Sequence, residues 1–197
     1  MRGSHVRPER EQSRHGEGAV IERIAIYGIG NILIGDDGVG PAVAHHLEAH
    51  WSFPENVIVE DLGTPSLDLP SYLMDRDFVI FIDAVVGDDP PGTIRTFTLE
   101  EIVAVSPGIR ISPHEPSIND ALLVLQFAGG GPREVLLVGI VPETTSGGIS
   151  LSSAVAAAVP RAAEEVLRAL EARGIHARPI SDWPPAMRTT SPVCGTA

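Results

Sequence analysis

The segment FVIFIDAVV, residues 78–86, constrains the fold more than any other part of the sequence. It is an almost continuous apolar run rich in β-branched side chains, which is typical of a strand covered on both faces. Such strands belong to parallel sheets, because the crossovers between parallel neighbours place helices on both sides. The segment therefore predicts an α/β protein with this strand near the centre of its sheet.

Other apolar segments alternate with helical patterns along the chain, as this architecture requires. Further strands are predicted at residues 21–27, 56–61 and 134–141, and a more exposed or edge strand at residues 92–99. Helices are predicted at residues 41–51, 66–74, 117–127 and 152–173, the last of them closed by Gly174. The expected fold is a three-layer α/β sandwich, in which helices flank a twisted, mostly parallel sheet.

Length and charge limit the number of domains and the classes of partner. A chain of 197 residues with 43% hydrophobic content suits one domain. That domain is predicted at residues 21–178, between a disordered extension at residues 1–20 and a disordered tail at residues 179–197. The formal net charge of −12 gives no basic field for binding phosphates, so no nucleic-acid partner is expected.

Three features of the sequence predict a cytoplasmic protein. No apolar run approaches the roughly 20 residues that span a bilayer, so membrane insertion is not expected. The first residues are polar and lack the apolar core of a signal peptide. The single cysteine, Cys194, cannot form an internal disulfide, which fits a reducing compartment.

A glycine-rich turn with two adjacent acids, GIGNILIGDDGVG at residues 28–40, joins the first predicted strand to the first helix. A dinucleotide fingerprint would need glycine where Leu33 stands, and acids would repel a pyrophosphate, so a nucleotide site is disfavoured. Asp36 and Asp37 could cap the helix or bind a ligand, and the motif alone does not separate the two roles.

Two more polar residues are predicted near the same edge of the sheet. Asp83 lies near the end of the most apolar strand, where ligands bind in such sheets and where an unpaired charge is costly. His114 lies between Pro113 and Pro116, which stiffen the backbone that presents it. With Asp37 they would form an open site for a divalent first-row metal, although such ligands do not select nickel over zinc, manganese or iron.

Five motifs occur in one order along residues 23–174 and resemble the hydrogenase maturation endopeptidases: GIGNILIGDDGVG, DLGT (residues 61–64), FIDAVV, SPHEPS and VGIVPE. The resemblance implies a phosphorylase/hydrolase-like α/β sandwich and an endopeptidase with aspartyl-type features. It also implies that DLGT influences which hydrogenase is recognised, with Leu62 in place of the glycine or cysteine of some relatives.

The resemblance implies a substrate and a site. The substrate would be the precursor of a [NiFe]-hydrogenase large subunit, from which a C-terminal peptide is cut. Asp37, Asp83 and His114 would bind nickel carried by the substrate, so no metal is expected to stay tightly bound in the isolated enzyme. Asp36 is a candidate general base for the attacking water and a less favoured alternative to Asp37 as ligand. Cys194 lies in the predicted tail and no serine stands in a nucleophile-elbow context, so a covalent route lacks a nucleophile.

Three rival hypotheses stay open at this point. The chain could be another metallopeptidase of the same fold that holds its own metal. It could be a nickel-binding maturation chaperone without catalysis. It could be a nucleotide-binding module.

Overall fold

The protein is built on a five-stranded sheet. Its strands are β1 (Ile24–Ile29), β3 (Val57–Gly63), β4 (Phe78–Ala84), β5 (Ile94–Thr98) and β6 (Glu134–Ile140), and they lie in the order β3-β1-β4-β6-β5. The computed structural model describes residues 21–104 and 118–180. Four strands are parallel, and the edge strand β5 pairs antiparallel with β6. The mostly parallel sheet, its central strand β4 and its edge strand β5 are therefore confirmed.

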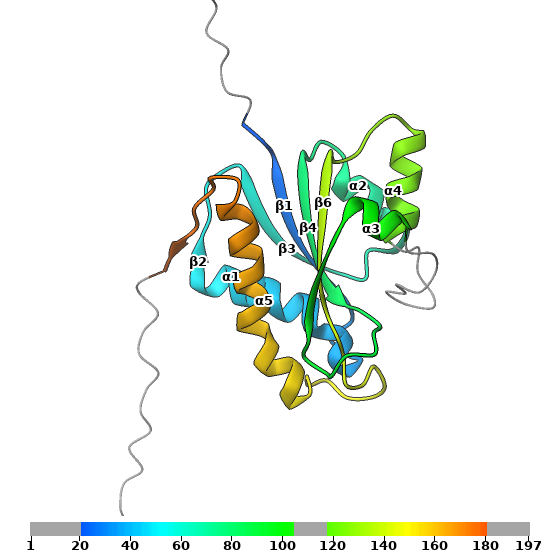
Figure 1. The fold of residues 1–197 in the computed structure, drawn as a ribbon, viewed down its shortest axis with the longest axis vertical. Coiled ribbons are helices and arrows are strands. Elements are labelled where there is room, and N and C mark those ends of the chain that lie inside the picture. The colour runs from blue at the N-terminus through cyan, green and yellow to red at the C-terminus, as the bar shows by residue number, and fades with distance from the viewer. Residues whose placement is uncertain (1–20, 105–117, 181–197) are drawn as a thin grey trace, which may run out of the picture.

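Helices cover both faces of the sheet, which gives the predicted three layers (Figure 1). One face carries α1 (Val39–His50) and α5 (Ser153–Glu171), and the other carries α2 (Leu69–Leu73), α3 (Leu99–Ala104) and α4 (Ile118–Phe127). Two 3-10 turns, η1 (Gly35–Gly38) and η2 (Ser66–Asp68), precede α1 and α2. A separate antiparallel pair joins β2 (Trp51–Ser52) to β7 (Arg178–Pro179).

The side chains of β4 explain why its sequence is continuously apolar. All seven residues of this strand are buried. Phe78, Ile80 and Ile82 pack in the core beneath α1 and α5, whereas Val79 and Phe81 pack in the core on the opposite face. Alternate residues of β4 thus pack in two different cores. A polar side chain on either face of the strand would be buried among apolar ones.

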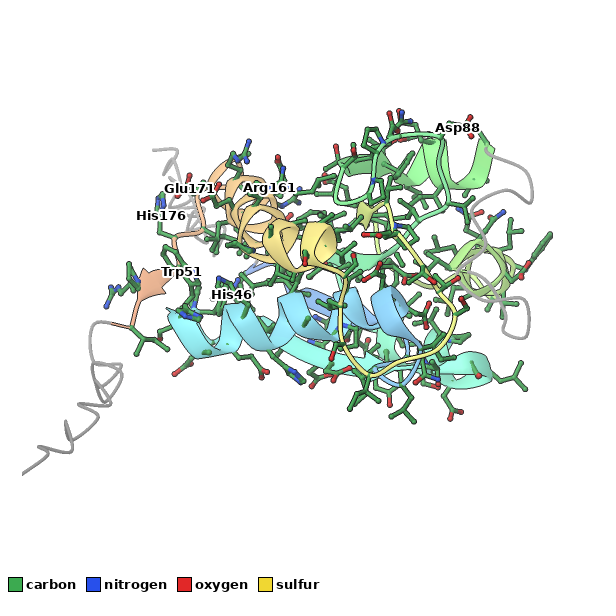
Figure 2. The ribbon with its side chains drawn as sticks, turned by 90° about the horizontal axis from the view of Figure 1, so that it is seen from below. His46, Trp51, Asp88, Arg161, Glu171 and His176 are labelled. Carbon is green, nitrogen blue, oxygen red and sulfur yellow. The ribbon has the colours of Figure 1, made fainter. Side chains whose placement is uncertain are left out.

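The parallel strands bring four loops to one edge of the sheet. The carboxyl ends of β1, β3, β4 and β6 point the same way, toward the lower part of Figure 1. Figure 2 views the molecule from this side and shows the yellow loop between β6 and α5 arching across it. We call this the strand-end edge, where α/β proteins of this type bind ligands.

Three predicted features fall wholly or partly outside the described residues: the extension at residues 1–20, most of the tail, and His114. The start of the predicted tail is part of the fold, because Pro179 pairs with Trp51 and Ile180 donates a backbone hydrogen bond to His50. Within residues 21–104 and 118–180, no helix is both long enough and apolar enough to traverse a bilayer.

Candidate active site

The glycine-rich turn after β1 lies directly on the ends of the central strands. At Gly40 a Cβ atom would overlap the backbone carbonyl oxygens of Ile29 and Ile82, so only glycine lets the start of α1 approach β1 and β4 this closely. Gly30 adopts a positive φ of 138°, and a Cβ there would overlap the carbonyl oxygen of Asp37. These glycines therefore seat η1, which carries Asp36 and Asp37, against the end of β4, where Ile82 precedes Asp83.

Asp83 is a completely buried carboxylate near the end of β4. Its Oδ1 accepts a hydrogen bond from the backbone N–H of Ala84 at 2.7 Å, and in the sheet it lies opposite Gly139 of β6. A buried carboxylate needs hydrogen bonds or a counter-charge to be stable. Its strand holds the side chain in a fixed place, as a binding site requires.

Asp37 is half-buried in η1 and is held by its own loop. Its Oδ2 accepts a hydrogen bond from the backbone N–H of Asn31 at 2.7 Å. The side chain of Asn31 in turn accepts one from the backbone N–H of Leu33 at 2.9 Å. No role was predicted for Asn31 from the sequence, although its place after Gly28-Ile-Gly30 suits a residue that closes a tight turn.

Asp36 points away from solvent and joins this turn to a distant loop. It is completely buried, and its carboxylate accepts backbone hydrogen bonds from Glu143 at 2.8 Å, Thr144 at 3.1 Å and Ser152 at 2.6 Å. Burial by itself would raise the pKa of Asp36, but these three backbone donors outweigh it and hold the pKa below its ordinary value. This contact explains part of the VGIVPE motif, because the backbone N–H of its last residue, Glu143, donates one of these hydrogen bonds.

The surroundings of Asp36 bear on two roles considered for it. The N-cap of α1 is Gly38, and no side chain accepts a capping hydrogen bond from the first turn of this helix. Neither acid caps α1, so that interpretation is wrong. A general base works best with a pKa near the operating pH and with access to the proton it removes. A buried carboxylate that accepts three backbone hydrogen bonds meets neither condition, so its environment favours a positioning role over the predicted role of base.

The structure brings two of the three predicted metal ligands to the strand-end edge. Asp37 lies in η1, which packs on β4, and Asp83 lies in β4 itself. His114 lies outside the described residues. In the part of the chain that the structure describes, no three or more His, Cys, Asp or Glu side chains are grouped to hold a metal ion. The three-ligand set therefore stays a prediction.

Comparison with known proteins decides the family. The model of the family described as hydrogenase maturation protease matches residues 41–169, well over half of the chain. The chain belongs to this family. As a hydrogenase maturation protease it is a peptidase, which confirms the enzyme class expected from the five motifs.

Individual relatives support the same assignment. Hydrogenase 2 maturation protease of Escherichia coli (strain K12) is 36% identical over 158 residues, which cover 80% of this chain and 96% of that protein. Hydrogenase expression/formation protein HupM of Azotobacter chroococcum mcd 1 is 35% identical over 157 residues, or 79% of this chain and 75% of that protein.

Solved structures of maturation proteases share the fold. The hydrogenase maturating endopeptidase HybD from E. coli superposes with a TM-score of 0.75 at 36% identity, covering 82% of this chain and 99% of that one. The [NiFe] hydrogenase maturation protease HybD from Thermococcus kodakarensis gives a TM-score of 0.58 at 26% identity, covering 75% and 98%. The predicted sandwich fold is thus the fold of the family.

Proposed function

We propose that the chain is an endopeptidase that removes a C-terminal peptide from the nickel-loaded precursor of a [NiFe]-hydrogenase large subunit. Family membership supports a maturation protease in general terms. The observation that supports this site is the placement of Asp37 and Asp83, which lie at the strand-end edge in η1 and in β4. His114 is assigned as the third ligand on its motif alone.

The proposed ligands fit the chemistry of a substrate-borne nickel ion. Carboxylate oxygens and an imidazole nitrogen are suitable donors for divalent first-row metals. A metal at the scissile bond can polarise the carbonyl or lower the pKa of an attacking water. The chain's own contribution would be to fix the donors, with Asp83 held in a buried strand and Asp37 held by the N–H of Asn31.

Single-residue variants test the assignment. Asp37→Asn, Asp83→Asn and His114→Gln are each mixed with nickel-loaded precursor, and cleavage is followed by gel mobility and by the mass of the released peptide. Each variant should lose about a hundredfold or more in rate, since weaker grip on the metal removes several kcal/mol of stabilisation from the transition state. Asp75→Asn is the matched control, because Asp75 is exposed in the turn that leads into the amino end of β4 and has a φ of 62° that asparagine tolerates.

The outcomes separate the proposal from its rivals. Cleavage at the wild-type rate by Asp83→Asn would contradict the proposed site. Binding of the precursor without any cleavage by the wild-type chain would favour the chaperone hypothesis instead. Nickel or zinc retained at one equivalent by the chain after dialysis, together with cleavage of unrelated peptides, would favour a metallopeptidase that carries its own metal.

A further inference from the structure

Several large apolar side chains are exposed around the strand-end edge. Their exposure contributes nothing to the stability of the fold, because they are not packed in either core. Five of them form what we call the strand-end rim: Ile32, Leu33, Ile34, Val86 and Ile149. Their exposed fractions range from 37% to 80%. They come from three loops, those that follow β1, β4 and β6. Exposed apolar side chains gathered around a site, rather than scattered singly, mark interaction surfaces.

Two of these loops are locked together, so the rim is held in place before any partner arrives. Ile34 forms a β-bridge with Gly148, and the backbone N–H of Gly35 donates to the carbonyl oxygen of Gly148 at 2.6 Å. Asp36 adds its three hydrogen bonds to the same loop after β6. A surface held in its binding conformation avoids the entropy cost of ordering loops on association.

The loops around the rim are themselves acidic. The loops at the strand-end edge, residues 30–38, 61–68, 85–93 and 141–152, contain seven acidic residues and no lysine or arginine. The exposed acids among them include Asp68, Asp88 and Glu143. Two arginines from neighbouring elements contact the loop after β4: Arg95 of β5 forms an ion pair with Asp89, and Arg161 of α5 donates a hydrogen bond to the carbonyl oxygen of Gly92 at 2.9 Å. Arg133 and Arg173 lie at the opposite end of the sheet, where they form ion pairs with Asp77, Glu22 and Glu134.

We propose that the strand-end rim is the docking surface for the large-subunit precursor, and that the precursor segment seated on it carries apolar side chains flanked by lysine or arginine. The inference rests on the proposed function, because it places the precursor next to Asp37 and Asp83. Apolar contacts at the rim supply affinity, and the surrounding carboxylates select a cationic segment and speed its approach.

Binding is measured separately from cleavage to test this docking surface. Asp83→Asn serves as the parent, so that the complex is not consumed, and its affinity for purified nickel-loaded precursor is measured by calorimetry. Adding Leu33→Ser and Ile149→Ser should weaken binding at least tenfold. Adding Asp88→Asn and Glu143→Gln should weaken binding at low salt and flatten the dependence of the affinity on salt. Ile21→Ser with Met74→Ser removes two exposed apolar side chains away from the rim and should leave the affinity unchanged.

Photo-crosslinking identifies the segment that binds. A benzophenone amino acid replaces Leu33 in the parent, and the crosslinked precursor peptide is sequenced by mass spectrometry. The expected peptide is apolar with flanking lysine or arginine. An acidic peptide, or no crosslink to a precursor that binds, would overturn the docking surface.

The failure of this inference differs from the failure of the proposed function. If the wild-type chain cleaves the precursor, and adding Leu33→Ser and Ile149→Ser to the Asp83→Asn parent leaves the affinity unchanged, the docking surface is overturned. The peptidase role stays in place in that case. Binding through the rim by a wild-type chain that never cuts the precursor would overturn the peptidase role and support the docking surface. A wild-type chain that neither binds nor cuts the precursor would overturn both.

Discussion

Replacement of Asp36 by asparagine separates a positioning role from a catalytic one. In the wild-type chain, one carboxylate oxygen accepts from Glu143 and Thr144, and the other accepts from Ser152. An asparagine of nearly the same shape would keep one acceptor oxygen but turn its amide group toward a backbone N–H. One buried N–H would lose its partner, and the other two hydrogen bonds would lose their charge.

The magnitude follows from these hydrogen bonds. A buried amide without a partner costs about 1–3 kcal/mol, and each loss of charge assistance costs on the order of 0.5 kcal/mol. Asp36→Asn should therefore lower the free energy of unfolding by about 3 kcal/mol. For a domain of this size that corresponds to a fall in Tm of about 9 °C. The rate of cleavage should fall as well, through a higher KM, because the loop carrying Asp37 and the rim loses its anchor.

Acid titration gives an independent readout of the same group. The folded-state pKa of Asp36 lies below its ordinary value. Its contribution to stability is thus fully present above the unfolded-state pKa and is lost as pH falls through the folded-state pKa. In Asp36→Asn, the loss of stability between neutral and acidic pH should be shallower than in the wild-type chain.

Thermal denaturation, urea denaturation and steady-state cleavage are measured on the same preparations, with Asp75→Asn as control. The reasoning would be refuted if Asp36→Asn kept the wild-type Tm and KM while kcat fell by about a hundredfold or more. That pattern is expected of a general base, because an amide preserves shape but cannot accept the proton.

Three further predictions follow from the same structure. Gly40→Ala should destabilise the fold by about 3 kcal/mol, because its Cβ would overlap the carbonyl oxygens of Ile29 and Ile82, and an unchanged urea midpoint would contradict this. Hydrogen bonding from Arg133 lowers the pKa of Asp77, so Arg133→Gln should flatten the fall of stability with decreasing pH, as measured by denaturation at several pH values. The isolated chain should lose added nickel on dialysis, as measured by atomic absorption; one equivalent retained would contradict the view that the metal arrives with the substrate.

The central layer and the place of Asp83 could be predicted from sequence because each rests on a local pattern. The apolar run around Phe81 required burial on both faces, and its polar residue near the end required a special environment. The exposed pattern at residues 92–99 correctly indicated an edge strand. The alanine-rich segment ending at Gly174 correctly indicated α5, which closes with Gly174 at a φ of 75°.

Other features depend on contacts that no local pattern contains. Asp36 meets its donors 107–116 residues further along the chain, so spacing around it could not distinguish a helix cap from an anchor. The first strand was expected to end at Gly28 but continues through Ile29, since the glycine serves the close approach of Gly40 rather than ending the strand.

Short elements were also beyond the reach of periodicity. The six-residue α3 is too short to show a helical repeat, and it was missed. The helix expected at residues 66–74 is a 3-10 turn followed by the five-residue α2. The two-residue strands β2 and β7 pair across most of the chain length, through Trp51 with Pro179, and have no signature of their own.

Cleavage of matched precursors with and without nickel tests the central claim most directly. Purified chain is incubated with nickel-loaded and nickel-free large-subunit precursor, and the mass of the large subunit is followed with time. The account predicts loss of a C-terminal peptide from the loaded form only, and no loss from it when the enzyme carries Asp83→Asn. Equal trimming of the nickel-free form would contradict a site in which Asp37 and Asp83 act on a metal brought by the substrate.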